Sequence, residues 1–281
     1  MTEPGSSGPD LGPGALAALM ERPGFDDAMM AVARLVVAEY RVSWLMNRIL
    51  SDRGRLVASF MALDFHFADP ERRGFTLEQL RNEAVRGGFA SRGRITAWAG
   101  SMRLLGLFAA GSPGRPQRLV PTPKFLAMFR ARLENIWRSI TQIHPRAGEA
   151  ILALVDERFV AGLAAALMVP YRTEQRLFDA IPELVEIAER EAGMVVLMSV
   201  MLKHMAGEAI TIAGLAGEFT ISRAHVRSIL QTASGKGLLV QAEGGLYQVL
   251  PALEDALRQF FAALFQVHIF AIDRALARVG G

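Results

Sequence analysis

The chain has 281 residues, of which 51% are hydrophobic, and a formal net charge of +3 at pH 7. This length is enough for two domains, each with its own apolar core. The absence of cysteine excludes disulfides, thiolate metal sites and cysteine nucleophiles, and it fits a cytoplasmic protein.

The first part of the chain divides into a tail and a helical unit. Residues 1–24 begin with a Gly-, Ser- and Pro-rich run that lacks the basic and apolar regions of a signal peptide, so we expect a disordered tail. Residues 25–143 are predicted to form a first unit. One or two helices over 25–49 and a further helix over 54–63 carry apolar residues at helical spacing.

Two later stretches share one plan. Ser91 opens a stretch that ends in Gly106-Leu107, and Ser222 opens one that ends in Gly237-Leu238. Serine suits the N-cap of a helix, and glycine suits a left-handed stop that leads into a strand. Because apolar residues recur at helical spacing behind both serines, each stretch predicts a short helix with one buried face.

The outer faces of these two helices carry polar and basic side chains. They are either ordinary solvated faces or donors to phosphates and base edges. The candidate DNA-binding residues are Ser91, Arg92, Arg94, Thr96 and Arg103 in the first stretch and Ser222, Arg223, His225, Arg227, Ser228 and Gln231 in the second. A shorter helix and a turn precede each stretch, over 75–90 and 210–221, which is the order of a helix-turn-helix.

The run 215–230, followed by Lys236-Gly-Leu-Leu239, resembles the second and recognition helices and the first wing strand of MarR-like winged-helix regulators. Residues 115–126 are similar to the basic wing of that family, which adds Arg115, Gln117 and Arg118 to the candidates. The sequence departs from the family pattern at residues 120–122 and at Gly244-Gly245. The resemblance implies a mainly α fold with small β-wings, in which tandem winged helix-turn-helix units form an intramolecular pseudo-dimer.

The remaining segments are predicted to hold the two units together. A long helix over 123–144 should break before Pro145, because proline disfavours helix in the residue before it. Connecting and interface helices are expected over 144–192, including one over 147–169 and one or two around Pro182. The second unit covers 193–281, with helices over 193–202 and 251–279. The apolar runs 159–169 and 194–202 fall short of the roughly twenty residues that a membrane span needs, so we expect no membrane partner.

Motifs for catalysis and metal binding are missing from the sequence. Neither a Walker phosphate loop nor a Gly-x-Ser-x-Gly elbow occurs. His268 lies within an apolar face and is predicted to be a buried residue rather than a ligand. His204 and Glu208 form a pair without a third ligand, which does not make a zinc site. We therefore expect no enzyme, no metal and no cofactor.

Charge is distributed unevenly along the chain. Between Trp44 and Ile143 there are 16 Lys and Arg against 7 Asp and Glu, whereas between His144 and Gly281 there are 12 against 15. Because phosphate neutralisation supplies most non-specific affinity, the first unit should hold DNA more strongly. We expect a transcriptional regulator that binds an imperfect palindrome in double-stranded DNA as a monomer. The alternative is a tandem winged-helix adaptor for protein interactions with weak or no DNA binding.

A small effector is a further expectation. The resemblance implies that a small aromatic or anionic ligand binds between the interface helices and the DNA-binding units. Tyr40, Trp44 and Trp137 are the candidate pocket residues, although large aromatics at helical spacing are usually core.

Overall fold

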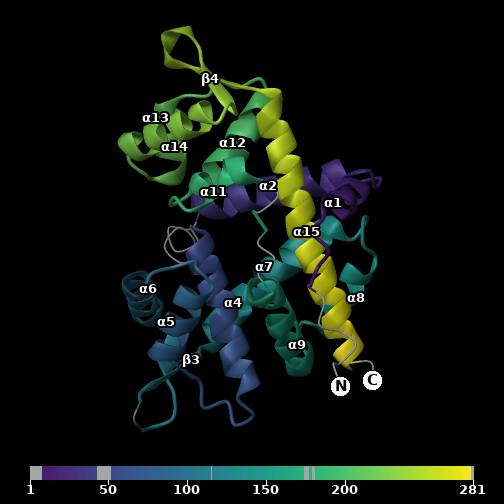
Figure 1. Ribbon diagram of the computed structural model, residues 1–281, viewed down its shortest axis with the longest axis vertical. Helices are drawn as coiled ribbons and strands as arrows, with labels where there is room; N and C mark the ends of the chain where they lie inside the picture. The colour runs from purple at the N-terminus through teal and green to yellow at the C-terminus, as the bar shows by residue number, and fades with distance from the viewer. Residues whose placement is uncertain (1–7, 43–51, 115, 174–176, 179–180, 280–281) are drawn as a thin grey trace.

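The computed structural model describes residues 8–42, 52–114, 116–173, 177–178 and 181–279. The chain is mainly helical, with one three-stranded and one two-stranded antiparallel sheet among these residues. Helix α15 (Pro251–Val279) runs along most of the longest axis of the molecule (Figure 1). Trp44 lies outside the described residues.

Six helices form the scaffold. They are α1 (Pro13–Met20), α2 (Phe25–Val42), α7 (Pro123–Ile140), α8 (Arg146–Ala153), α9 (Glu157–Leu167) and α15. Helix α15 packs against α9, α1, α8 and α2, and α2 also packs against α7. Phe261 and Phe265 of α15 are fully buried, and Phe265 meets the ring of Phe25 edge-on. The apolar face predicted for 251–279 therefore forms the centre of the fold.

Two segments with the same order of elements are attached to this scaffold. The first contains α4 (Arg53–Ala68), β1 (Phe75–Thr76), α5 (Leu77–Arg86), α6 (Arg92–Leu104), β2 (Phe108–Ala110) and β3 (Arg118–Pro121). The second contains α12 (Gly193–Met205), α13 (Ile212–Phe219), α14 (Arg223–Gly235), β4 (Leu239–Gln241), the short 3-10 turn η1 (Glu243–Gly245) and β5 (Tyr247–Val249). In each, three helices precede a β-hairpin.

The sheets are small and antiparallel. In the first segment the strand order is β1-β3-β2, with Phe75 opposite Leu119 and Phe108 opposite Pro121. In the second segment β4 pairs with β5, and an isolated bridge joins Ile210 to Tyr247. This bridge occupies the place that β1 has in the first segment, directly before the second helix of the three.

The local signals at the ends of α6 and α14 behave as predicted. Ser91 Oγ accepts from the backbone N–H of Arg94 at 3.3 Å, and Ser222 Oγ accepts from that of His225 at 3.1 Å. Gly106 and Gly237 follow these helices with φ of +68° and +72°, a conformation that glycine adopts without a Cβ penalty. The predicted apolar faces are buried.

Two predictions of secondary structure are wrong. Residues 13–20 of the expected tail form α1, whose Leu16 and Leu19 are buried against the scaffold. The single helix expected over 147–169 is divided into α8 and α9, because Asp156 accepts from the backbone N–H of Arg158 at 2.8 Å and caps a new helix. The short helices α10 (Val169–Arg172) and α11 (Pro182–Ala188) then lead to the second segment.

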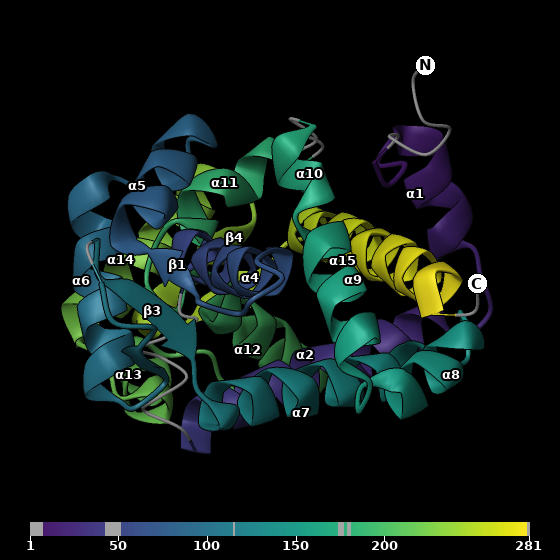
Figure 2. The same cartoon turned by 90° about the horizontal axis from the view of Figure 1, so that it is seen from below.

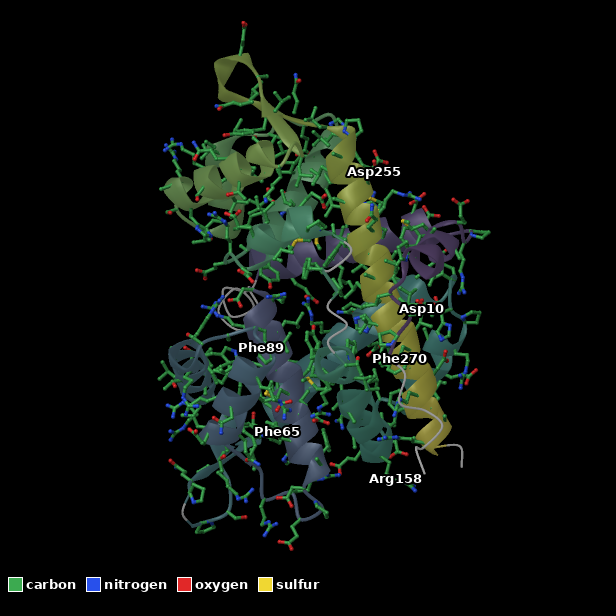
Figure 3. The ribbon with its side chains drawn as sticks, viewed as in Figure 1. Asp10, Phe65, Phe89, Arg158, Asp255 and Phe270 are labelled. Carbon is green, nitrogen blue, oxygen red and sulfur yellow. The ribbon has the colours of Figure 1, made fainter. Side chains whose placement is uncertain are left out.

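Helix α15 is an apolar helix that the comparison of shorter apolar runs in the sequence did not include. By length and composition it qualifies as a membrane-spanning helix, with a mean hydropathy of 1.5 over its best window. That window is 56% buried inside the fold, and a core helix passes the same test. Figure 3 shows Asp255 near one end of α15, beside the second segment, and Phe270 farther along the same helix.

Candidate nucleic-acid interface and ligand cavity

Helices α6 and α14 lie on the same side of the molecule. Figure 1 and Figure 2 both show α6, α13 and α14 on the side away from α1 and α8. Helix α5 packs against α6 within the first segment, and α13 packs against α14 within the second. The two helices that were predicted to contact DNA therefore share one face of the protein.

Three predicted contact residues of α14 are open to solvent. Arg223, Arg227 and Gln231 are exposed. Within the described ranges, the two arginines have no acidic side chain within 4.0 Å, and Gln231 has no hydrogen-bond partner. These side chains are free to donate to an external acceptor.

The other side chains of the α14 face are already bonded inside the protein. Ser222 caps the helix. His225 Nε2 lies 2.8 Å from the backbone oxygen of Glu191, and Ser228 Oγ accepts from Arg190 at 2.6 Å. These contacts form because α11 packs against this face of α14. The assignment of His225 and Ser228 to DNA contact stays a prediction, and it requires these internal bonds to be exchanged.

The basic residues at the start of α6 are paired with acids. Arg92 Nη2 lies 2.6 Å from Glu78, and Arg92 Nη1 donates to Asn82 Oδ1 at 2.6 Å. The hydrogen bond from Arg92 is the main cause that lowers the pKa of the Glu78 carboxyl. Arg94 lies 3.0 Å from Asp52 Oδ1, and it donates to the backbone oxygen of Glu189 at 3.4 Å.

The remaining predicted residues of α6 differ in whether their polar atoms are free to contact DNA. Thr96 donates to the Arg92 carbonyl at 2.8 Å and accepts from Arg81 at 2.9 Å, so its hydroxyl proton is already used. Arg103 is exposed and, within the described ranges, has no acidic partner. The structure therefore places Arg94 and Thr96 in internal contacts that the sequence did not indicate, and their contact with DNA stays a prediction.

The predicted basic wing contributes little free charge. Arg115 lies outside the described residues, and Gln117 is exposed. Arg118 is turned inward, since its Nη1 donates to the Gly74 carbonyl at 2.6 Å and lies 3.9 Å from Asp69. Arg118 therefore fastens β3 to the loop before β1, and its assignment to the DNA contact stays a prediction that this internal pairing weakens.

A short segment between α11 and α12 touches both candidate helices. We call residues 189–192 the junction segment. Arg94 of α6 reaches its Glu189 carbonyl, while His225 and Ser228 of α14 contact Glu191 and Arg190. Sequence reasoning missed this contact, although the run Glu189-Arg190-Glu191 directly before a helix was visible as a cluster of charges.

The junction segment is also tied to α4. Arg53 Nη2 lies 2.9 Å from Glu189 Oε1, and Arg55 Nη1 lies 3.9 Å from Glu191 Oε1. Asp52 caps α4 by accepting from the backbone N–H of Arg55, and its buried carboxylate also pairs with Arg94. The start of α4 thus joins the junction segment to α6.

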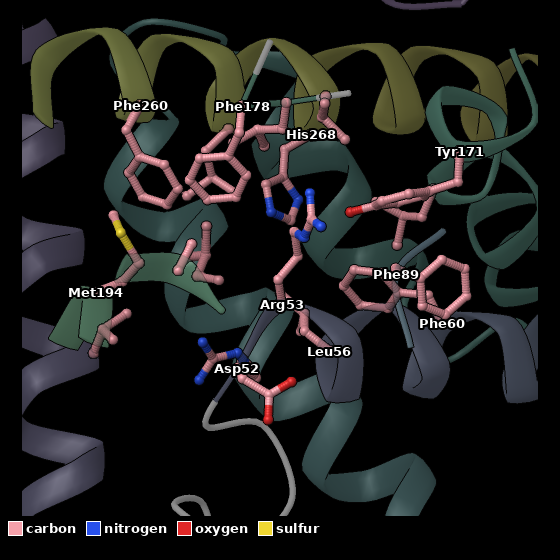
Figure 4. Close-up of a pocket in the computed structure, with 18 of the residues that line it drawn as sticks. Asp52, Arg53, Leu56, Phe60, Phe89, Tyr171, Phe178, Met194, Phe260 and His268 are labelled. Carbon is pink, nitrogen blue, oxygen red and sulfur yellow. The ribbon is translucent and has the colours of Figure 1, made fainter. Parts of the chain in front are cut away.

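A cavity of about 580 Å³ lies where the two segments meet the scaffold. Its walls come from α2, α4, α5, α7, α10, α12 and α15, with one residue each from the ends of α9 and α11. The walls are mostly apolar, with Phe60, Phe89, Phe178 and Phe260 among the rings that line it. Figure 4 shows Arg53, Tyr171 and His268 directed into this space from three different elements.

Of the predicted pocket residues, Tyr40 lines the cavity and Trp137 does not. Trp137 is fully buried, packs edge-on against Phe159 and donates its Nε1–H to His268 Nδ1 at 3.2 Å. The assignment of Trp137 to the pocket is therefore wrong, while the prediction that His268 is buried is confirmed. The sequence did not predict that His268 also lines the cavity, because helical spacing shows which face is buried but not what lies next to it.

Burial fixes the protonation of two lining side chains. It lowers the pKa of His268 to about 4, with a smaller contribution from the positive charge of Arg132. The ring is therefore neutral at pH 7, and because Nδ1 accepts from Trp137, the proton resides on Nε2. Burial also raises the pKa of Tyr171 to about 12, so its hydroxyl keeps its proton.

The described residues contain no group of three His, Cys, Asp or Glu side chains that could hold a metal ion. His204 and Glu208 do not pair, since Glu208 lies 3.1 Å from Lys203 instead. Comparison of the chain with protein-family models, curated proteins and solved structures finds no match.

Proposed function

We propose that this protein is a transcriptional regulator that binds double-stranded DNA as a monomer, through two winged helix-turn-helix units arranged as an internal pseudo-dimer. The observation that carries the proposal is the presentation of α6 and α14 on one face, each capped by serine and each third in a run of three helices before a hairpin. Such a helix enters the major groove in helix-turn-helix proteins.

The contacts of the second unit support this proposal most directly. Arg223 and Arg227 lie in the first two turns of α14 and have no acidic partner among the described residues. Guanidinium groups recognise phosphates and the acceptor atoms of guanine in a bidentate manner. In the first unit, Arg92, Arg94 and Arg103 are the exposed cations of α6, and only Arg103 lacks an acidic partner among the described residues. Arg92 must exchange Glu78 for a phosphate before it contacts DNA.

The second candidate function is a protein-interaction adaptor. It is favoured by the acidic partners of the predicted contact residues in the first unit, since Arg92 pairs with Glu78 and Arg94 with Asp52. These pairings neutralise the two arginines, which lowers their attraction for phosphate. An adaptor would show negligible DNA affinity at physiological salt.

We expect the double variant Arg223→Ala, Arg227→Ala to weaken binding to a duplex selected from a random-sequence pool. If an arginine contacts a base edge, its loss should cost about 1 to 3 kcal/mol of binding free energy and relax the sequence preference at that position. If it contacts a phosphate, its loss should weaken binding to all sequences alike and reduce the salt dependence of the affinity. Gel shifts at rising salt measure both effects, because each neutralised phosphate adds about 0.9 to the slope of log affinity against log salt.

The matched control is Arg138→Ala, Arg146→Ala, which removes the same charge from α7 and α8. These arginines pair with Glu134 and Asp273 on the scaffold. An equal loss of affinity in the control would assign the binding to net charge alone. If the wild type shows no shift with any selected duplex, the adaptor is the better function.

A further inference from the structure

We infer that the open edge of β2 and the adjoining end of α6 bind an extended, acidic segment of a partner protein, which pairs with β2 as an additional strand. The segment carries apolar side chains at alternate positions. This inference goes beyond the proposed function, because it holds whether or not the protein binds DNA.

The first observation is that β2 has a strand neighbour on one side only. The strand order is β1-β3-β2, so β2 lies at the edge of the described sheet. Leu107 and Gly111 each make a backbone hydrogen bond of 2.9 Å toward β3. Because bonded pairs alternate along an antiparallel ladder, the N–H and C=O groups of Phe108 and Ala110 point away from β3. They have no backbone partner on the open side among the described residues. Such an edge can accept another strand.

The second observation is a shallow hollow between the edge of β2 and the end of α6. Leu104 in this hollow is 88% exposed, and covering a leucine that water surrounds is favourable. Neighbouring strands lie about 4.8 Å apart, so the inner side chains of a strand added to β2 would lie over the hollow. Alternate residues of that strand would face it. The residues that line the hollow are Gly100, Arg103, Leu104, Phe108, Ala109 and Ala110.

The hollow and the exposed leucine are specific to the first unit. The serine caps of α6 and α14 are 222 − 91 = 131 positions apart. Gly100 therefore corresponds to Gln231, and Leu104 corresponds to Gly235. In the second unit a long side chain stands in place of the glycine, and no side chain stands in place of the leucine. Strand β4 pairs with β5 only, so the second unit has an open edge without the adjoining apolar surface.

The charge beside the hollow selects the occupant. Arg103 and Lys124 are exposed, and neither has an acidic side chain within 4.0 Å in the described part of the chain. Lys124 lies at the end of α6, since its Nζ donates to the Leu105 carbonyl at 3.2 Å. Residues 84–133 contain nine Lys and Arg and no Asp or Glu. An acidic segment is therefore attracted to this surface.

Two other occupants fit this surface less well. A second copy paired through β2 about a two-fold axis would bring Arg103 and Lys124 of both copies together, and like charges across an interface are unfavourable. A DNA phosphate would be attracted by the same charges, but it gains nothing from the exposed Leu104 or from the unpaired backbone of β2. An extended acidic peptide uses all three features.

The test begins with a library of random nine-residue peptides, displayed on phage and selected on the immobilised full chain. The enriched peptides should carry a net negative charge and apolar residues at alternate positions. A fluorescein-labelled synthetic copy of the most enriched peptide then gives the dissociation constant by fluorescence anisotropy. Hydrogen–deuterium exchange of residues 107–111 should slow when this peptide binds, because the outward amides gain acceptors.

Ala110→Pro tests the backbone pairing directly. It removes an outward N–H and leaves the ladder to β3 intact, which is a position where an edge strand tolerates proline. The peptide should bind this variant roughly tenfold more weakly or worse, because a hydrogen bond is lost and the ring obstructs the edge. The matched control is Gln241→Pro, the equivalent change on the open side of β4, which should bind like the wild type.

Two further variants keep the test decisive if Ala110→Pro does not fold. Gly100→Gln fills the hollow as in the second unit, and a Cβ at this position meets nothing within 4 Å. Leu104→Ala removes the exposed apolar surface. Each should weaken peptide binding about threefold or more. Leu152→Ala, at a leucine of α8 that is 79% exposed, is the control and should bind like the wild type.

Several outcomes would overturn the inference. They are the absence of any enriched peptide, enrichment of peptides without negative charge, and equal binding of the peptide by the wild type and a folded Ala110→Pro, Gly100→Gln or Leu104→Ala variant. A dimer that dissociates in Leu104→Ala would assign the edge to a second copy. Weaker binding of a selected duplex by Gly100→Gln and Leu104→Ala, without peptide binding, would assign it to DNA. Peptide binding without DNA binding would reject the proposed function alone.

Discussion

Gly193 shows how one residue shapes the junction segment. It begins α12 directly after Ala192, and a Cβ at this position would lie 1.9 Å from the backbone oxygen of Ile187 in α11. No real Cβ makes such a contact. The close approach of α11 to α12 therefore requires glycine, and it places Glu189, Arg190 and Glu191 between the two units.

We predict that Gly193→Ala lowers the free energy of unfolding by about 2 kcal/mol or more, because α11 must move away from α12. The matched control is Gly217→Ala in α13, where an added Cβ meets nothing within 4 Å. That change should stabilise the protein by about 0.5 to 1 kcal/mol, since alanine loses less conformational entropy in a helix. Urea unfolding followed by circular dichroism measures both. A stable Gly193→Ala variant would contradict the close approach.

Among the elements, α1 differs most from the sequence-based expectation. Its composition suggested a disordered tail, yet Leu16 and Leu19 are 3% and 2% exposed. The helix packs on α15, whose long apolar face needs to be covered on several sides. Eight residues are too few for a stable isolated helix, so α1 exists because of this tertiary contact.

Leu19→Ala should therefore destabilise the whole protein. We expect a loss of about 2 to 3 kcal/mol, at the lower end of the usual cost of a buried Leu→Ala change, because α1 is short and peripheral. The exposed Ala17→Ser on the same helix is the control and should change stability by less than about 0.5 kcal/mol. Thermal and urea unfolding would show the difference. Equal stability of the two variants would mean that α1 does not contribute to the native fold.

At the scale of the whole molecule, the two units are unequal. The first segment carries the larger net positive charge in sequence, but its arginines Arg92, Arg94 and Arg118 are bonded to acids or carbonyl groups. The second carries Arg223 and Arg227 without acidic partners in the described chain. The expectation that the first unit dominates DNA binding is therefore revised in our proposal, which assigns the stronger contact to α14.

This asymmetry leads to a prediction about the operator. One chain should bind each duplex, and mutations in one half-site should weaken binding more than the equivalent mutations in the other. Sedimentation of a labelled duplex gives the stoichiometry, and footprinting of half-site variants gives the inequality. The half-site whose footprint weakens when the double variant Arg223→Ala, Arg227→Ala replaces the wild type is the one that α14 contacts. Two chains per duplex with equal half-sites would contradict an internal pseudo-dimer.

The sequence by itself determined the local features of this protein. The caps at Ser91 and Ser222, the stops at Gly106 and Gly237, and the buried faces of α6, α14 and α15 were all predictable. Each depends on residues within a few positions of one another, where helix geometry fixes which groups meet. The repeated order of three helices and a hairpin followed from the same signals.

Only the tertiary structure decided which polar groups are free. The Arg94 contact with Glu189 spans 95 positions, the Trp137 contact with His268 spans 131, and the Arg53 contact with Glu189 spans 136. Periodicity carries no information about such pairs, because they depend on how the helices pack. For the same reason the cavity, the junction segment and the burial of α1 arise from the packed scaffold and not from any single stretch of sequence.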